Sequence, residues 1–138
     1  SSPTRRSSDL TDRPDEEGYM KISDVKELLE AEVLVGEDQL DEDVFSACGC
    51  DMMSDVLAYV KDQAVLMTGL VSPQVVRTAA MMDMVCIVFV RSKKPTQAML
   101  ELAKSIGLVI MTSNLRLYEA CGRLYLNGLR GDKAKENV

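Results

Sequence analysis

The sequence VCIVFV at residues 85–90 decides the fold, because every one of its positions is apolar. Two similar runs lie on either side of it, AVLMT at residues 64–68 and LVIMT at residues 108–112, and an amphipathic stretch follows each run. A strand that is apolar throughout is buried on both faces, as in a parallel sheet covered by helices on both sides. We therefore predict that the three runs lie side by side in the middle of a mostly parallel sheet of about five strands, in a three-layer α/β/α fold.

The N-terminal half adds two strands and two helices to this prediction. Ser23 is a favourable cap for a first helix. Residues 32–35 (EVLV) and residues 44–50 (VFSACGC) are the two further strands. Either Asp51 or Ser54 can cap the helix that follows the second of them.

The C-terminal half contains three further helix signals. Ser72 is placed to cap a helix whose first residue is Pro73, and Pro95 is predicted to begin the next helix in the same way. Gly107 supplies the left-handed residue that commonly ends a helix. The last helix is predicted to follow residues 113–114.

The length of 138 residues supports one domain, which we assign to residues 20–129. Residues 1–19 are polar and contain two prolines, so we expect a disordered tail, a linker or an expression remnant. Residues 130–138 are expected to form a frayed C-terminal tail. The longest apolar run is far shorter than the roughly 18 residues of a membrane span, and no signal-peptide pattern opens the chain. We expect a cytoplasmic protein without a membrane partner.

The net charge of −6 is distributed unevenly along the chain. Residues 1–90 contain 7 basic and 18 acidic residues, a net charge of −11, whereas residues 91–138 contain 9 and 4, a net charge of +5. The overall acidity argues against nonspecific nucleic-acid binding, which depends on clustered cations. The two halves either attract each other within one domain or favour the antiparallel pairing of two copies.

The common catalytic signatures are missing from this sequence. It contains no histidine, which removes the usual general base near neutral pH and the triads built on imidazole. It also lacks the GxxxxGK[ST] loop, the GxGxxG fingerprint and the GxSxG elbow. These absences leave carboxylate or cysteine chemistry open, and an enzyme of carboxylate type that uses Asp51 or Asp55 is the least favoured hypothesis. We expect a protein that is not an enzyme and that uses no cofactor.

The sulfur-containing residues allow two interpretations each. Cys48 and Cys50 form a CxC pair whose side chains share one face of a strand, and they could seed a metal or redox site. Reduced, buried thiols are the favoured interpretation, so no metal site is expected. The nine methionines either fill gaps in the core or, around Met81 and Met82, form a contact surface for a partner or a second copy.

The loops that follow the strands contain the candidate ligand-binding residues. In open α/β sheets ligands bind beyond the carboxyl ends of the strands, where helix N-termini favour anions. A small anionic ligand or nucleotide is the expected ligand, although the same residue types also serve as helix caps and solvated lysines. The candidates are Asp51, Ser54, Thr68, Gly69, Ser72, Arg91, Lys93, Lys94, Thr112, Ser113 and Asn114.

Four stretches of the chain resemble the DRTGG domain family in order and character. They are MKISDVKELLEAEVLVGED (20–38), CGCDMMSDVLAYVKDQAVLMTGLVSPQVVRTA (48–79), CIVFVRSKKP (86–95) and TSNLRLYEACGRLYLNGL (112–129). The family's naming motif is expected at residues 67–73, where this chain keeps Gly69 but has neither the Asp nor the Arg. Arg91 or Arg77 would have to substitute for that arginine.

The resemblance implies an accessory role. Similar domains occur as a regulatory module beside CBS domains in certain pyrophosphatases and as a segment of some phosphotransacetylases, and they are related to the N-terminal domain of HPr kinase/phosphorylase. The implied function is a non-catalytic regulatory or protein-interaction module, a homodimer with a possible partner enzyme. Short copies are also encoded near iron-only hydrogenases, which implies, as an alternative, a redox or metal-handling accessory protein that uses Cys48 and Cys50.

Overall fold

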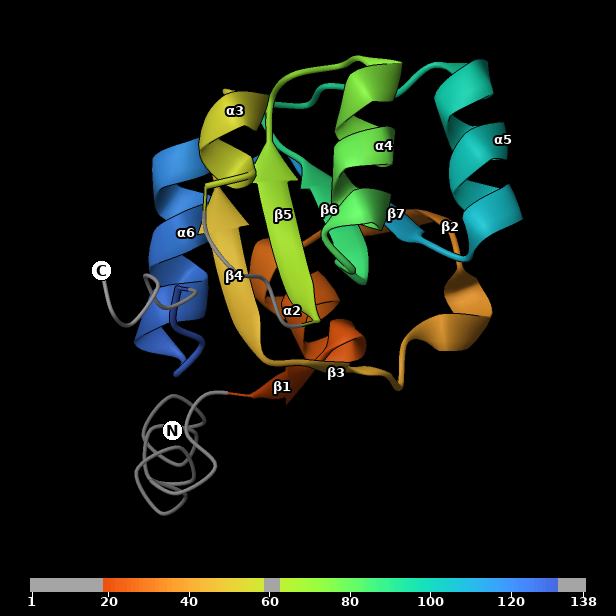
Figure 1. Ribbon diagram of the computed structural model, residues 1–138. Coiled ribbons are helices and arrows are strands. Elements are labelled where there is room, and N and C mark those ends of the chain that lie inside the picture. The colour runs from red at the N-terminus through yellow and green to blue at the C-terminus, as the bar shows by residue number, and fades with distance from the viewer. Residues whose placement is uncertain (1–18, 59–62, 132–138) are drawn as a thin grey trace.

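A five-stranded sheet forms the centre of the computed structural model, which describes residues 19–58 and 63–131. The strand order is β2–β7–β6–β5–β4, and all neighbours are parallel except the antiparallel edge strand β2 (Figure 1). The three apolar runs are the three central strands, as predicted. The strands are β2 (Glu32–Val35), β4 (Ser46–Gly49), β5 (Ala64–Thr68), β6 (Cys86–Phe89) and β7 (Val109–Thr112).

Helices cover both faces of this sheet, which confirms the three-layer α/β/α prediction. One face packs against α2 (Ile22–Leu29) and α6 (Leu117–Leu126). The other face packs against α3 (Met53–Val56), α4 (Pro73–Met81) and α5 (Gln97–Ile106) (Figure 1). A 3-10 turn, η1 (Glu37–Gln39), and a small ribbon of β1 (Met20–Lys21) with β3 (Asp43–Val44) complete the described elements.

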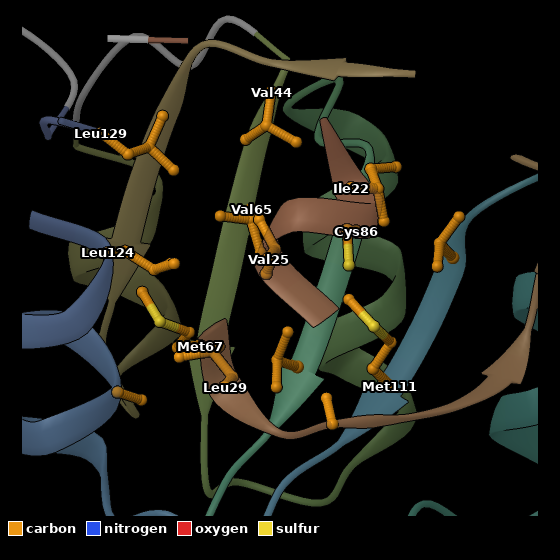
Figure 2. Close-up of a cluster of buried hydrophobic side chains, with 14 of the residues drawn as sticks. Ile22, Val25, Leu29, Val44, Val65, Met67, Cys86, Met111, Leu124 and Leu129 are labelled. Carbon is orange, nitrogen blue, oxygen red and sulfur yellow. The ribbon is translucent and has the colours of Figure 1, made fainter. Parts of the chain in front are cut away.

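The central strands are apolar because the side chains of each strand point alternately into two hydrophobic clusters, one on each face of the sheet. Val65 and Met67 of β5 point into the cluster with α2 and α6 (Figure 2). Leu66 of the same strand and Phe89 of β6 belong to the second cluster, beneath α3, α4 and α5. All four side chains are at most 1% exposed. Alternation along a strand therefore places every residue of β6, and every residue of β5 except Thr68, in one apolar layer or the other.

The helix caps confirm some of the predictions and correct others. The Ser72 hydroxyl accepts a hydrogen bond from the Gln74 N–H at 3.2 Å, with Pro73 as the first residue of α4. Helix α5 ends at Gly107, which adopts φ +76°. Its N-cap is Thr96, so the prediction that Pro95 is its first residue was wrong.

The N-terminal elements also differ from the prediction. Helix α2 begins one residue before Ser23, and the Lys21 N–H is bound by the Asp24 carboxylate at 3.0 Å. The stretch 44–50 divides between β3 and β4, and Phe45 separates the two strands. Neither Asp51 nor Ser54 caps the four-residue helix α3, whose N-cap position is taken by Met52.

Residues 130–131 lie along the outer edge of β4. The Ala47 N–H donates to the carbonyl of Arg130 at 2.9 Å, and Gly131 forms a parallel bridge with Ala47. The rest of the expected tail, residues 132–138, and the N-terminal segment 1–18 lie outside the described residues. Within the described part of the chain, the helices are too short to cross a membrane.

Candidate functional site

Three loops meet at the carboxyl ends of β4, β5 and β6. Asp51 follows β4, and Gly69 directly follows β5. Asp51 Oδ1 accepts hydrogen bonds from the Gly69 N–H at 2.8 Å and from the Thr68 hydroxyl at 2.9 Å. Because these strands are parallel neighbours, their ends lie at one edge of the sheet, and Asp51 joins two of the loops there.

Arg91 brings the third loop to the same point. Its Nη1 lies 3.8 Å from Asp51 Oδ2, and its guanidinium lies directly against Gly69. A Cβ atom at Gly69 would overlap the guanidinium, so the glycine is what allows this close approach. The structure thus places an aspartate and an arginine around Gly69, but both come from neighbouring loops and not from residues 67–73.

The loop that carries Arg91 has an unusual backbone. Arg91 and Ser92 both adopt left-handed conformations, with φ +59° and +60°. Two hydrogen bonds to the neighbouring loop hold them, from the Arg91 N–H to the Leu115 carbonyl at 2.7 Å and from the Ser92 N–H to the Ser113 carbonyl at 3.0 Å. Conformations of this kind cost on the order of 1–3 kcal/mol for residues other than glycine and concentrate at functional sites.

The electrostatics of the junction keep Asp51 ionised. The Gly69 N–H is the largest cause of a lowered Asp51 pKa. Burial, the second-largest effect, opposes it, and the Thr68 hydroxyl and Arg91 add to the lowering. Both side chains of the Asp51–Arg91 pair are a little under half exposed, so the pair itself contributes little stability. Arg91 has further N–H donors besides Nη1, and a second anion can use them.

The lowered pKa of Asp51 predicts a pH effect on stability. Since the folded-state pKa is below the unfolded one, the stabilisation is present above the unfolded pKa and is lost as the pH falls through the folded pKa. Asp51→Asn keeps the acceptor oxygen and removes the titration. We expect urea unfolding of wild type and variant to differ by less than about 1 kcal/mol at neutral pH and to converge between about pH 5 and pH 2. A gap that widened in acid would contradict this assignment.

The remaining predicted residues after β6 and β7 hold these loops together. The Ser92 hydroxyl donates to Asn114 Oδ1 at 2.8 Å. The Thr112 hydroxyl donates to the Lys93 carbonyl at 2.8 Å, and the buried Ser113 hydroxyl donates to the Leu29 carbonyl at 2.7 Å. Thr112 and Ser113 therefore position the loops from within.

The side chains of the four other candidates make no contact with Asp51, Gly69 or Arg91 among the hydrogen bonds and ion pairs described above. Ser72 is engaged as the cap of α4, and Ser54 is exposed on α3. Lys93 and Lys94 are both exposed beyond Arg91, so they add positive charge beside the junction. Arg77, the other arginine considered from the sequence, is exposed on α4.

The cysteines are thiols, and their surroundings differ. Burial raises the pKa of Cys86 strongly and that of Cys121 to a lesser degree, which disfavours the reactive thiolate. Cys48 and Cys50 pack against the same core cluster, as their spacing predicts. Cys50 Sγ accepts from the Met52 N–H at 3.3 Å. Across residues 19–58 and 63–131, no three His, Cys, Asp or Glu side chains gather in a way that could hold a metal ion.

The pairing of Asp51 with Gly69 and Arg91 was not found from the sequence, although all three residues were candidates. Each of them comes at or just after the end of an apolar strand, and this position is the sequence pattern that could predict a role in the site. Only the strand order shows that these three ends are neighbours.

Comparison with known proteins supports the architecture. The chain matches no protein-family model and no curated protein. Among solved structures it is similar to the crystal structure of the CBS and DRTGG domains of the regulatory region of Clostridium perfringens pyrophosphatase, complexed with the activator diadenosine tetraphosphate. The TM-score is 0.63 at 13% identity, over 79% of this chain and 47% of that one. The similarity shows a shared fold, and this chain spans about half of that structure.

Proposed function

We propose that this protein is a non-catalytic, cytoplasmic regulatory module that binds a small phosphate-containing anion, such as a nucleotide, at the junction of Asp51, Gly69 and Arg91. The observation that carries the proposal is the position of the Arg91 guanidinium, which is partly exposed and lies directly on a glycine. A phosphate can approach such a guanidinium in the plane of its N–H groups and accept two hydrogen bonds.

The surroundings of Arg91 support an anionic ligand. Lys93 and Lys94 follow it in the same loop and are exposed, and both side chains bring positive charge. The N-terminus of α4 begins four residues after Gly69, and the positive end of its dipole favours negative charge. Asp51 holds the guanidinium from one side by a contact that is too weak to neutralise it fully.

The similar solved structure is consistent with a regulatory role. That structure is a regulatory region, and it was crystallised with a nucleotide activator. We propose by analogy that this chain binds its ligand in order to regulate a partner enzyme, and that it acts as a homodimer. The four thiols fit the reducing environment of the cytoplasm.

The proposal is tested by titrating the full chain with ATP, diadenosine tetraphosphate and inorganic pyrophosphate in a calorimeter. Arg91→Ala should weaken binding at least roughly tenfold, because hydrogen bonds to a charged group contribute about 1.5–3 kcal/mol. Arg77→Ala is the matched control, since it removes another exposed arginine, on α4, and should leave the affinity unchanged.

Two results would contradict the proposal. One is the absence of any heat or thermal stabilisation with all three probes. The other is binding that Arg77→Ala weakens as much as Arg91→Ala, because the affinity would then reflect general positive charge and not this junction.

A further inference from the structure

A cavity of about 450 Å³ lies at the β2 edge of the sheet. It is bounded by β2, by η1 and by the last turn of α5 (Figure 1). Small-molecule sites in proteins commonly have volumes of about 300–1,000 Å³, so the cavity is large enough for a small ligand. Its lining combines half-buried apolar residues of one strand with exposed charged residues of both signs: Val33, Leu34, Val35, Glu37, Asp38 and Lys104.

The cavity is separate from the Asp51 junction. Strand β2 runs antiparallel to β7, so its last residue, Val35, lies beside Ile110 near the beginning of β7. The Gln39 side chain of η1 donates from Nε2 to the Gly107 carbonyl, which precedes β7, at 3.0 Å. The Asp51 junction lies at the other end of the sheet, where the parallel strands finish. The cavity is therefore a second candidate site.

The wall that carries the two acidic residues is held in place by the rest of the fold. Besides the bond from its side chain, Gln39 donates its N–H to the Gly36 carbonyl at 2.9 Å, which closes the turn. Gly36 lies so close to β7 that a Cβ atom there would overlap Val109. The backbone of Glu37 and Asp38 is thus already ordered, so a ligand has little chain to immobilise when it binds.

The charged side chains of the cavity have no partner among the described residues. Neither Glu37 nor Asp38 forms an ion pair or a side-chain hydrogen bond, and the same is true of Lys104. Other exposed charges of this chain do pair, as Lys21 does with Asp43 at 3.1 Å. One ammonium group and two carboxylates at a single cavity are therefore available to a ligand that carries both charges.

The strand at the base of the cavity offers backbone groups and excludes a competing ligand. Because β2 is the last strand of the sheet, its outer N–H and C=O groups have no ladder partner within the described residues. Leu34 is the extra residue of a bulge, since Val33 pairs with Met111 and Val35 with Ile110. A bulge of this kind disrupts pairing along an edge, which favours a small ligand over an added peptide strand.

We infer that this cavity binds a free α-amino acid with an apolar side chain. The carboxylate of the ligand pairs with the Lys104 ammonium group, and the ligand ammonium group pairs with the carboxylates of Glu37 and Asp38. The ligand side chain lies against the apolar residues of β2. A simple anion or cation satisfies only one side of the cavity, so the arrangement favours a zwitterion. This site is independent of the phosphate-binding site in the proposed function.

The test is a titration of the isotope-labelled full chain with L-leucine, followed in two-dimensional NMR spectra. Leucine should shift the amide signals of residues 33–39 and 104 and leave those of Asp51, Gly69 and Arg91 in place. N-acetyl-leucine lacks the ammonium group and leucinamide lacks the carboxylate, so each should bind at least roughly tenfold more weakly. Glycine should also bind more weakly, because it has no side chain to bury.

A lysine variant locates the carboxylate of the ligand. Lys104→Ala should weaken leucine binding at least roughly tenfold and leave leucinamide binding unchanged, because only leucine has the carboxylate that Lys104 binds. Lys26→Ala is the matched control, since Lys26 also lies in the last turn of a helix, in this case α2, and it should change neither affinity. Lys104 is exposed, so its replacement leaves the core intact.

Three results would overturn the inference. One is the absence of shifts at residues 33–39 and 104 with millimolar leucine. Another is equal affinity for leucine and any of the three comparison compounds, which would remove the need for an ammonium group, a carboxylate or an apolar side chain. The third is an equal loss of leucine binding in Lys26→Ala and Lys104→Ala. The calorimetric titration of the Arg91 site depends on none of these results, so failures of the two sites are distinguishable.

Discussion

Replacing Phe89 by alanine should lower the free energy of unfolding by about 3–5 kcal/mol. Phe89 has no exposed surface and belongs to the core cluster beneath α4 and α5, in the middle strand of the sheet. Its removal leaves a cavity between the sheet and the helices, and the sheet side cannot move in to fill it without disturbing the ladders of β6 with β5 and β7. Urea denaturation followed by circular dichroism measures the change.

Phe45 provides the matched control, because it is the other phenylalanine of the chain and is 41% exposed. Phe45→Ala removes the same atoms from the loop between β3 and β4, where the ring is partly exposed and contacts the ring of Tyr19. We expect a loss below about 1 kcal/mol. Equal losses for the two variants would mean that the burial of Phe89 between the sheet and the helices does not account for its contribution to stability.

Ser113→Ala should cost about 2–4 kcal/mol, although it removes a single oxygen atom. The Ser113 hydroxyl donates to the Leu29 carbonyl and accepts from the Leu115 N–H at 3.1 Å, and the residue is 2% exposed. The variant leaves a carbonyl at the end of α2 and an N–H in the loop after β7 without this partner. A buried polar group that is left without a partner costs about 1–3 kcal/mol, and the contact with the Leu115 N–H is only partly buried.

The same loop supports the proposed ligand site, so Ser113→Ala should also disturb Arg91. The Ser113 and Leu115 carbonyls hold the strained backbone of Ser92 and Arg91. Ser105→Ala is the control, since the Ser105 hydroxyl also donates to a carbonyl, that of Leu102, but on the exposed surface of α5. That variant should change stability by at most about 0.5 kcal/mol. Equal effects of the two alanines would show that burial of the Ser113 hydroxyl is not what matters.

The central strands could be predicted from the sequence because burial on both faces leaves a pattern that depends on no other part of the chain. A run such as 64–68, apolar at nearly every position and only five residues long, is typical of a strand in the middle of a covered sheet. The start of α4 at Ser72 and Pro73 could be predicted for the same reason. A hydroxyl cap and a missing N–H act within one helical turn and depend on no distant contact.

Features that depend on distant contacts were predicted less well. Ser23 has the right chemistry for a cap, but the β1–β3 ribbon fixes Lys21 in an extended conformation and starts α2 earlier. The division of residues 44–50 has the same cause, because Val44 pairs with Met20. In the candidate site, the neighbours of Asp51 follow from the strand order, which a single sequence does not specify.

The outer face of α6 shows a different difficulty. The stretch LYEACGRLYL is apolar around most of its circumference, so its periodicity identifies a buried side without excluding a second one. From the sequence, Leu117, Ala120 and Leu124 could be assigned to the core. Only the structure shows that Tyr118 and Leu126 point away from it.

The hydrogen bond between Ala47 and the carbonyl of Arg130 has a consequence for solubility. An outermost strand with unsatisfied amides is a template on which strands of other molecules can stack, and this growth leads to fibrils. Here residues 130–131 occupy that rim of β4 as a short parallel addition to the sheet. This two-residue addition occupies the outer edge of β4 at Ala47, so that part of the edge is not available to a strand of another molecule.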